Sequence, residues 1–268
     1  MSTEHIENLL ASQQQGHSQH HKYWKGGFDP EQVDTKRHYS MHSTCLPIVK
    51  SLAPETLLTI GDHTGRDAAY YKRYVGCKST ASSLSVDHLQ QAVIDGFLDD
   101  AVVVNAEKID LPDDSIDVVV IKESFHHFPR PMVGFYECLR VAKKAVILIE
   151  PNDCKNNGTN TQTFYKDKDY SDAYEAAGNY KYQISLREIC KAMWAIKYPQ
   201  VVVTGFNDPY GHADYQNEKD KLNVMGFAST RCFNLLTIAC IKEKTNLEET
   251  LDTSVYTIYN RPIDPYEK

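Results

Sequence analysis

The chain has 268 residues, of which 41% are apolar and 24% charged, so it can bury a substantial core as one large domain or two small ones. Its formal net charge of −7 and isoelectric point near 5.9 argue against a general binder of nucleic acids or anionic membranes. No segment approaches the roughly 20 apolar residues of a membrane helix, and residues 1–15 lack the features of a signal peptide, so we expect a cytoplasmic chain.

Residues 1–44 are polar and rich in His and Gln. We expect them to form a partly flexible N-terminal arm that can pack over a binding site, with Tyr23, Trp24 and Phe28 near its end. The cluster of His17, His20 and His21 is typical of a solvated tail rather than of a metal-ligand set. The main domain is expected over residues 45–243, and residues 244–268 form an acidic tail without a clear pattern.

From residue 55 onward, apolar runs of strand length alternate with segments of helix length. Continuously apolar strands in this arrangement are typical of a parallel sheet that is covered on both faces. We therefore predict an α/β fold with a doubly wound, seven-stranded sheet, mostly parallel and ending in an antiparallel hairpin. The strands are expected at Thr56–Ile60, Ser79–Leu84, Ala101–Asn105, Ser115–Ile121, Ala145–Glu150, Val201–Phe206 and Phe233–Ile241.

Helices are expected between these strands. The first, Arg66–Tyr74, should end at Gly76, because glycine readily adopts the left-handed conformation found after many helices. Apolar spacing and helix-start signals indicate the others. They are expected around Val86–Phe97, over Met132–Val141 and after a capping box at Ser185–Glu188.

Residues 152–183 interrupt the alternation, and we interpret them as an insertion. This segment is polar and rich in tyrosine, including Tyr165, Tyr170, Tyr174, Tyr180 and Tyr182. The tyrosines can form a lid over a bound sugar or aromatic molecule, or they can lie on the surface without a ligand. The later segment Asn207–His212 follows a strand and either binds a ligand or is simply a turn.

Two polar segments follow strands of the predicted sheet. Gly61 and Gly65 bracket a turn where the backbone can approach a ligand and the next helix offers free N–H groups. The segment Ile121–Phe128 reads Ile-Lys-Glu-Ser-Phe-His-His-Phe at the end of another strand. Ligands of open α/β sheets bind at the carboxyl ends of strands, so both segments indicate a small-molecule site. A reductase is the last alternative, because it would need the glycines of the dinucleotide-binding fingerprint, and these are missing.

The adjacent residues His126 and His127 are candidates for a general base, because an imidazole titrates near neutral pH. Glu123 is a third candidate, or a partner that orients one of the histidines. Consecutive side chains point in different directions, so at most one histidine is expected to face a substrate while the other packs or caps the next helix. Their spacing does not suit a metal ion. The seven scattered cysteines are expected to be buried free thiols.

Residues 55–151 resemble the class I S-adenosylmethionine-dependent methyltransferases, in the branch that includes small-molecule enzymes of the ubiquinone pathway. The resemblance is best from Asn105-Ala106-Glu107 through Glu150-Pro151-Asn152-Asp153. The run Lys122–Pro131, leading into Leu139–Lys144, is similar to a subgroup found in bacterial capsule and O-antigen clusters. The resemblance implies a Rossmann-like fold and an enzyme that uses S-adenosyl-L-methionine.

The resemblance also implies a cofactor site. The turn Gly61–Gly65 would hold the methionine moiety, the end of the second strand would reach the ribose, and Asn105 with Ala106 would frame the adenine. Thr59 and Ser83 stand where acidic residues are usual, His63 replaces a glycine, and Asp62 is expected to take over part of the ribose contact. The expected cofactor-binding set is Gly61, Asp62, His63, Gly65, Ser83, Leu84, Asn105, Ala106, Glu107 and Lys122.

Three functions remain open at this stage. The leading hypothesis is methyl transfer to a hydroxyl or phosphate-type oxygen of a small polar acceptor, which the subgroup suggests is a sugar or sugar phosphate of a surface glycan. The second is N- or C-methylation of an amine or quinone-like molecule, which needs no base. The third is a non-catalytic cofactor-binding or partner protein. Neither a nucleic-acid partner nor membrane insertion is expected, and the oligomeric state is open.

Overall fold

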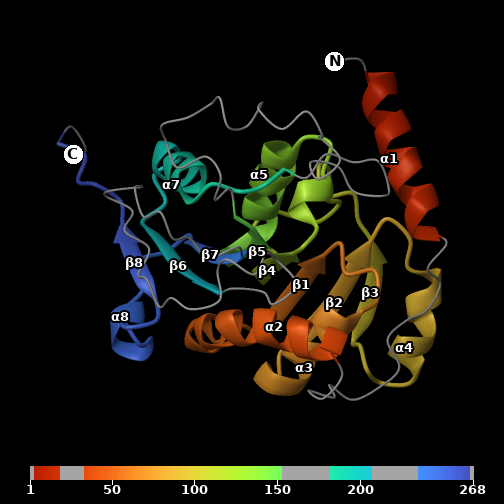
Figure 1. Ribbon diagram of the computed structural model, residues 1–268, viewed down its shortest axis with the longest axis horizontal. Coiled ribbons are helices and arrows are strands. Elements are labelled where there is room, and N and C mark those ends of the chain that lie inside the picture. The colour runs from red at the N-terminus through yellow and green to blue at the C-terminus, as the bar shows by residue number, and fades with distance from the viewer. Residues whose placement is uncertain (1–2, 19–32, 153–181, 207–234, 266–268) are drawn as a thin grey trace.

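The computed structural model describes residues 3–18, 33–152, 182–206 and 235–265, which form an eight-stranded mixed sheet between helices (Figure 1). The strand order is β3-β2-β1-β4-β5-β7-β6-β8. Neighbouring strands are parallel among the first five and antiparallel among the rest. The strands are β1 (Thr56–Ile60), β2 (Lys78–Ser83), β3 (Asp100–Val103), β4 (Ile116–Lys122), β5 (Ala142–Pro151), β6 (Gln200–Phe206), β7 (Leu235–Ile241) and β8 (Thr257–Asn260).

The Rossmann-like, mostly parallel sheet and the antiparallel pair β6–β7 are confirmed, but the expected number of seven strands was wrong. The eighth strand, β8, lies in the C-terminal tail. It pairs with β6 from Gln200↔Asn260 to Val203↔Thr257. A four-residue edge strand is too short to produce an alternating pattern, so β8 could not be recognised from the sequence.

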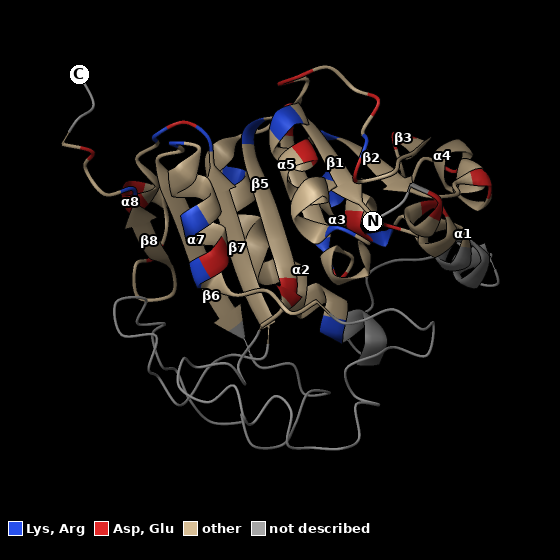
Figure 2. Cartoon of the chain, turned by 90° about the horizontal axis from the view of Figure 1, so that it is seen from above, with Lys and Arg blue, Asp and Glu red and all other residues tan. Residues whose placement is uncertain are grey.

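The two faces of the sheet carry separate cores. Helices α5 (Pro131–Val141) and α7 (Leu186–Ala195) cover one face, and α2 (Val33–Leu52), α3 (Arg66–Val75) and α8 (Leu247–Thr250) cover the other (Figure 1). Successive strand residues point to opposite faces, so the buried run of β4 supplies Val119 and Ile121 to the first core and Val118 and Val120 to the second. Charged residues of β4 and β5 therefore lie near the strand ends (Figure 2).

The N-terminal segment is helical where it is described, in α1 (Thr3–Ser18) and α2. The expected boundary between residues 44 and 45 falls inside α2, whose Met41, Cys45 and Ile48 are fully buried against the sheet. The sequence concealed this helix because its interior also carries polar residues. These include His42, which is fully buried and hydrogen-bonded.

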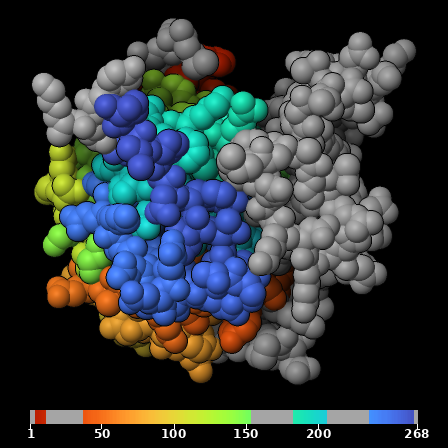
Figure 3. Space-filling view, turned by 90° about the vertical axis from the view of Figure 1, so that its left-hand side faces the viewer, coloured from red at the N-terminus to blue at the C-terminus, as the bar shows by residue number. Residues whose placement is uncertain are grey.

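The C-terminal segment completes the layer that contains α2. It lies along the edge of the molecule beside the segment of α7 and β6 (Figure 3). Leu247, Leu251 and Tyr256 are buried in the same core as α2, and the Tyr256 hydroxyl donates a hydrogen bond of 3.0 Å to the Thr44 carbonyl oxygen. The residues expected to form a separate tail, 244–268, therefore contribute side chains to the same packed layer as α2.

Two helices differ in detail from the expectation. The helix around Val86–Phe97 is a 3-10 turn (Asp87–Leu89) followed by α4 (Gln90–Ile94), and it ends at Gly96 with φ 77°. Phe97 is consequently outside the helix and 39% exposed. Ser185 precedes α7 as expected, but its side chain makes no capping hydrogen bond. Helix α3 does end at Gly76, with φ 80°.

The cysteines that the structure describes are buried free thiols, as expected: Cys45, Cys77, Cys138, Cys190 and Cys240. Within the described ranges, none of the helices combines the length and apolar character needed to cross a bilayer. Other expected features lie outside the described residues or side chains: His17, His20, His21, Tyr23, Trp24, Phe28, Asn207–His212 and the tyrosines of the insertion apart from Tyr182.

We predict that Leu251→Ala lowers the free energy of unfolding by about 2–5 kcal/mol, because it opens a cavity beneath α2. Val255→Ala is the matched control, since Val255 is 53% exposed and its truncation should change stability by less than about 0.5 kcal/mol. Denaturant unfolding of the full chain measures both values. Equal stability of the two variants would mean that the tail does not belong to the core.

Candidate active site

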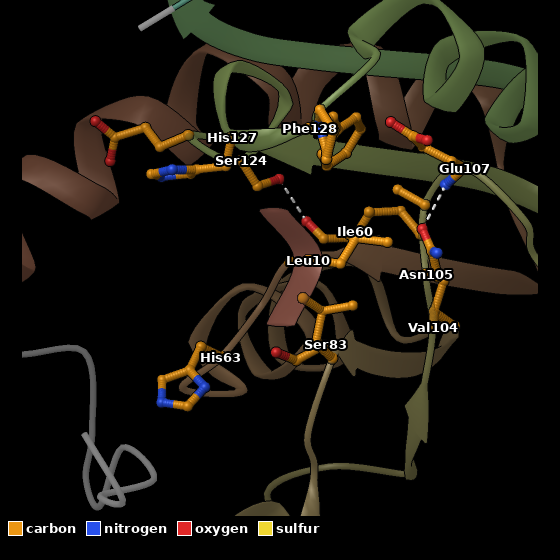
Figure 4. A pocket seen from close by; sticks show the side chains of 15 residues that line it. Leu10, Ile60, His63, Ser83, Val104, Asn105, Glu107, Ser124, His127 and Phe128 are labelled. Carbon is orange, nitrogen blue, oxygen red and sulfur yellow. Dashed lines mark hydrogen bonds between the residues drawn. The ribbon is translucent and has the colours of Figure 1, made fainter. Parts of the chain in front are cut away.

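A pocket opens at the carboxyl ends of β1 to β4 (Figure 4). It encloses about 640 Å³ of space free of protein atoms, part of it open to solvent, which is within the range of small-molecule sites. Each strand contributes the residues that follow it, and α1 contributes Leu10. The lining residues are Leu10, Ile60, Gly61, His63, Ser83, Leu84, Val104, Asn105, Ala106, Glu107, Glu123, Ser124, His127, Phe128 and Pro129.

Most residues of the expected site line this pocket. They are Gly61, His63, Ser83, Leu84, Asn105, Ala106, Glu107, Glu123 and His127. Asp62, Gly65, Lys122 and His126 are not among the lining residues, and each makes contacts beside or behind the pocket instead. The two histidines thus have different surroundings, since His127 lines the pocket and His126 does not.

The turn after β1 is held by close packing. Gly61 has φ 74°, and a Cβ atom there would lie 2.5 Å from the Ser124 Cβ. Gly65 has φ 71°, and its Cβ would lie 2.8 Å from the Leu98 side chain, away from the pocket. Both positions require glycine, but only a substitution at Gly61 would push on the pocket wall. The ring of His63 packs on that of His88, at 4.4 Å between centroids, and His88 contacts the His63 carbonyl oxygen.

Asp62 points into the protein rather than toward a ribose. Its Oδ2 accepts hydrogen bonds from Thr59 Oγ1 (3.1 Å) and from the Ala68 amide (2.9 Å) in the first turn of α3. Burial and the nearby charge of Asp67 raise the pKa of Asp62 to about 7. Thr59, which replaces the usual acidic residue, therefore helps to hold this carboxyl in the turn.

The wall after β3 is formed by Asn105–Glu107. The Asn105 Oδ1 accepts a hydrogen bond of 2.9 Å from the Glu107 amide, which leaves the side-chain nitrogen as the group able to donate to a ligand (Figure 4). The Glu107 carboxylate accepts hydrogen bonds from the backbone amide and the guanidinium of Arg130. The Nη2 atom of that guanidinium lies 2.7 Å from Glu107 Oε2. Arg130 precedes α5, so Glu107 fixes the start of that helix next to the pocket.

After β4, the chain makes a 3-10 turn at Phe125–His127. The buried carboxylate of Glu150, near the end of β5, accepts hydrogen bonds from the amides of Ser124 and Phe125 and from His126 Nδ1. His126 is consequently 5% exposed and turned away from the pocket, whereas His127 lines it. The two rings are in contact, 4.3 Å apart between centroids and tilted by 39°. The Ser124 Oγ donates to the Ile60 carbonyl oxygen (2.7 Å; Figure 4).

Glu123 is held by an ion pair with α2. Arg37 contacts both carboxylate oxygens, one of them at 2.9 Å, and Lys122 Nζ lies 3.8 Å away. Burial acts to raise the pKa of Glu123, but the charges of Lys122 and Arg37 outweigh it and lower that pKa. Glu123 is therefore an anion and a poor base at neutral pH. Its φ of 49° is a strained conformation for a residue other than glycine and directs this carboxylate to the pocket.

Lys122 is buried on the side of α2 rather than in the pocket. Its Nζ lies 2.9 Å from His38 Nδ1 and 3.5 Å from Asp67 Oδ1, and Asp67 also bonds to His42 Nε2 at 2.8 Å. Burial, followed by the charge of Lys122, lowers the pKa of His38 to about 4. Burial also lowers the pKa of His42. Lys122 thus anchors α2 to the sheet through neutral histidines.

Sequence reasoning missed Leu10, Arg37, His38 and Ser124. The first three lie in helices of the expected flexible arm, where no pattern marked them as site residues. Ser124 lay within the segment Ile121–Phe128, and its contact with Ile60 depends on the pairing of β1 with β4. Tyr182, at the end of the insertion, packs edge-on against Phe125 at 5.8 Å between centroids and so supports the same turn.

Comparisons with known proteins agree with this geometry. A family model described as a methyltransferase domain matches residues 58–149. The YcgJ protein of Bacillus subtilis is 17% identical, with a TM-score of 0.52, and the match covers 78% of this chain and 100% of that one. A Bacillus halodurans protein proposed to be a methyltransferase is also 17% identical, with a TM-score of 0.51 and coverage of 77% and 100%. No curated protein sequence matches the chain.

A third solved structure is that of an S-adenosylmethionine-dependent methyltransferase of Thermotoga maritima, described as a possible histamine N-methyltransferase. It is 19% identical with a TM-score of 0.49, over 78% of this chain and 95% of that one. The likeness to solved structures shows the fold, and the family model identifies residues 58–149 as a methyltransferase domain. The chain is a methyltransferase enzyme, and its cofactor is S-adenosylmethionine.

We predict that Gly61→Ala weakens S-adenosylmethionine binding at least about tenfold, because the new methyl group meets Ser124 and displaces the pocket wall. Gly76→Ala is the matched control. It has a similar φ of 80°, but a Cβ there meets nothing within 4 Å, so it should lose stability without losing affinity. Calorimetric titration measures both, and equal affinities would place the cofactor away from Gly61.

We also predict that stability falls on acidification partly through His38. Between pH 6.5 and about 4 the unfolded chain binds a proton at this residue that the folded chain does not, so the contribution is complete above pH 6.5 and is lost as the pH falls toward 4. His38→Gln should therefore flatten the slope of unfolding free energy against pH in this window. His5→Gln, at an exposed position of α1, is the control for the loss of a histidine.

Proposed function

We propose that this S-adenosylmethionine-dependent methyltransferase methylates a hydroxyl or phosphate-type oxygen of a small polar acceptor, with His127 as the general base for a hydroxyl. The observation that carries the proposal is the difference in surroundings of the two histidines: His127 lines the pocket together with Glu123, while His126 is bonded to Glu150. A base in the pocket is useful when the acceptor atom must lose a proton, as a hydroxyl does.

The residues that would hold the cofactor are those after β1, β2 and β3. Gly61 lines the pocket where the methionine moiety would lie, and a side chain there would displace Ser124 in the adjoining wall. Ser83 and Leu84 would face the ribose, and the Asn105 side-chain nitrogen can donate to an adenine ring nitrogen. When bound, S-adenosylmethionine supplies an electrophilic methyl group on a sulfonium centre.

The protein's own contribution is positioning and proton removal. The pocket wall after β4 would hold the acceptor oxygen in line with the methyl group, which is the largest effect available to such an enzyme. A ring nitrogen of His127 takes the hydroxyl proton as the new oxygen–carbon bond forms. The apolar side chains of Leu10, Ile60 and Phe128 exclude water, which favours a reaction in which charge is lost.

The charges around Glu123 favour a hydroxyl acceptor over a cationic amine. Glu123 offers carboxylate lone pairs to acceptor hydroxyls, yet Arg37 and Lys122 lie directly beside it. The cluster holds the positive charges of Arg37, Lys122 and Arg66 against the negative charges of Glu123 and Asp67. The buried carboxyl of Asp62, whose pKa is raised to about 7, adds a partial negative charge. An ammonium group would therefore gain little electrostatic attraction from this wall of the pocket, whereas hydroxyl groups would form hydrogen bonds with Glu123.

We propose further that the acceptor is a sugar or sugar phosphate of the cytoplasm, of the kind used to build surface glycans. Neighbouring hydroxyls suit a carboxylate such as Glu123, which accepts hydrogen bonds at both oxygens, and a phosphate would suit the excess of positive charge. The similarity of Lys122–Pro131 to enzymes of capsule and O-antigen clusters supports the same acceptor class. The non-catalytic alternative rested on Thr59 and Ser83, and the bond from Thr59 to Asp62 accounts for the first of them.

We predict that His127→Ala lowers turnover about 10²- to 10⁴-fold while the dissociation constant of S-adenosylmethionine changes little. The assay transfers a labelled methyl group to a panel of nucleotide sugars, sugar phosphates and glycan fragments, with small amines as a second panel. His126→Ala is the comparison variant, expected to act through the position of the turn and thus to a different extent. Near-normal turnover in the variant that carries both His126→Ala and His127→Ala would contradict the proposed general base. Transfer of the label to amines alone would contradict the proposed hydroxyl or phosphate acceptor.

A further inference from the structure

Glu150 is a fully buried carboxylate at the carboxyl end of β5. Three hydrogen-bond donors converge on it. Its Oε1 accepts from the amides of Ser124 and Phe125, both at 2.8 Å, and its Oε2 lies 2.6 Å from His126 Nδ1. All three donors belong to the segment Ser124–His126, which follows the neighbouring strand β4.

The two amide contacts cap the turn from outside. The first N–H groups of a helical turn have no partner within it, and a side chain just before the turn usually accepts from them. Ser124 occupies that position here but makes no such bond; its hydroxyl instead donates to the Ile60 carbonyl oxygen on β1. Glu150 supplies the missing acceptor from another strand, so the turn is fixed relative to the sheet.

The third contact fixes an imidazole. A carboxylate oxygen can only accept, so Nδ1 of His126 carries the hydrogen and the ring is held in one orientation. The centroid of the His127 ring lies 4.3 Å from that of His126, with the two ring planes tilted by 39°. Because the His126 ring is bonded to Glu150 and in contact with the His127 ring, it limits the directions that His127 can take.

We propose that Glu150 is the positioning residue of this site: it caps the turn and orients His126, and thereby directs His127 into the pocket. The inference rests on the proposed role of His127 in proton removal, but the placement of the turn can be tested without an acceptor. Glu150 touches neither substrate nor cofactor, since it is fully buried and is not among the pocket-lining residues.

The test separates the contact of Glu150 with the two amides from its contact with His126. In Glu150→Gln, the amide oxygen can still accept from Ser124 and Phe125, but the amide nitrogen faces His126 as a donor. The His126 ring must then carry its hydrogen on Nε2. In Glu150→Ala, both contacts are lost. Glu188→Gln, at an exposed position of α7, is the control for loss of a carboxylate.

Nitrogen NMR of labelled histidine rings reports the tautomer of His126 and the response of His127 to S-adenosylhomocysteine, the demethylated product. We expect a reversed His126 tautomer in Glu150→Gln with protected Ser124 and Phe125 amides. In Glu150→Ala, hydrogen exchange of those amides should be at least about tenfold faster, and the His127 response should be lost. With an accepted substrate, Glu150→Gln should lower kcat at least about tenfold at an unchanged cofactor dissociation constant.

An unchanged His126 tautomer in Glu150→Gln would overturn the proposal, and so would an unchanged His127 response in a folded Glu150→Ala. If Glu150→Ala does not fold, the tautomer in Glu150→Gln decides alone. Failure to find a hydroxyl acceptor would count against the proposed function and would leave these ring and amide measurements intact. A reversed tautomer with full kcat would show that Glu150 orients His126 without acting on catalysis, which also rejects the proposal.

Discussion

A strand that is buried on both faces can carry polar side chains only near its ends, and this constraint governs the structure. In β4, four consecutive apolar residues enter the two cores in alternation before the chain reaches Lys122 and Glu123. The charged groups of the central strands therefore lie near the two ends of each strand, and those at the carboxyl ends lie beside the pocket. Each must find a hydrogen-bond partner there or face a ligand, because an unpaired buried polar group is costly.

Three carboxylates solve this problem in the same way. Asp62 accepts from the first turn of α3, Glu107 from the start of α5 and Glu150 from the 3-10 turn after β4. In each case the residue that precedes the helical turn makes no side-chain capping bond of its own. A cap supplied from elsewhere in the chain stabilises the turn and also ties it to another element. The pocket is thus surrounded by turns whose positions are fixed by buried charge-assisted hydrogen bonds.

Helix α2 adds a second set of fixed charges on the other side of the site. Its residues Arg37, His38 and His42 meet Glu123, Lys122 and Asp67 in a network that leaves both histidines neutral and Glu123 anionic. Removing one partner of such a network leaves a buried charge unpaired, which is destabilising, so the network holds α2 in place against the sheet. This wall of the pocket consequently combines the Glu123 carboxylate with the positive charges of Arg37 and Lys122, and the proposal of a hydroxyl acceptor rests on that combination.

The sequence by itself determined seven of the eight strands, the turn at Gly61, the pocket walls after β2 and β3, and the different surroundings of His126 and His127. These features follow from local patterns: apolar runs, a left-handed glycine and the alternation of neighbouring side chains. Only the tertiary structure decided that Asp62 and Lys122 face inward, that Arg37 reaches Glu123, and that β8 joins the sheet. Each of those contacts joins residues whose relation depends on how strands and helices pack, and no spacing along the chain encodes which buried donor a carboxylate will meet.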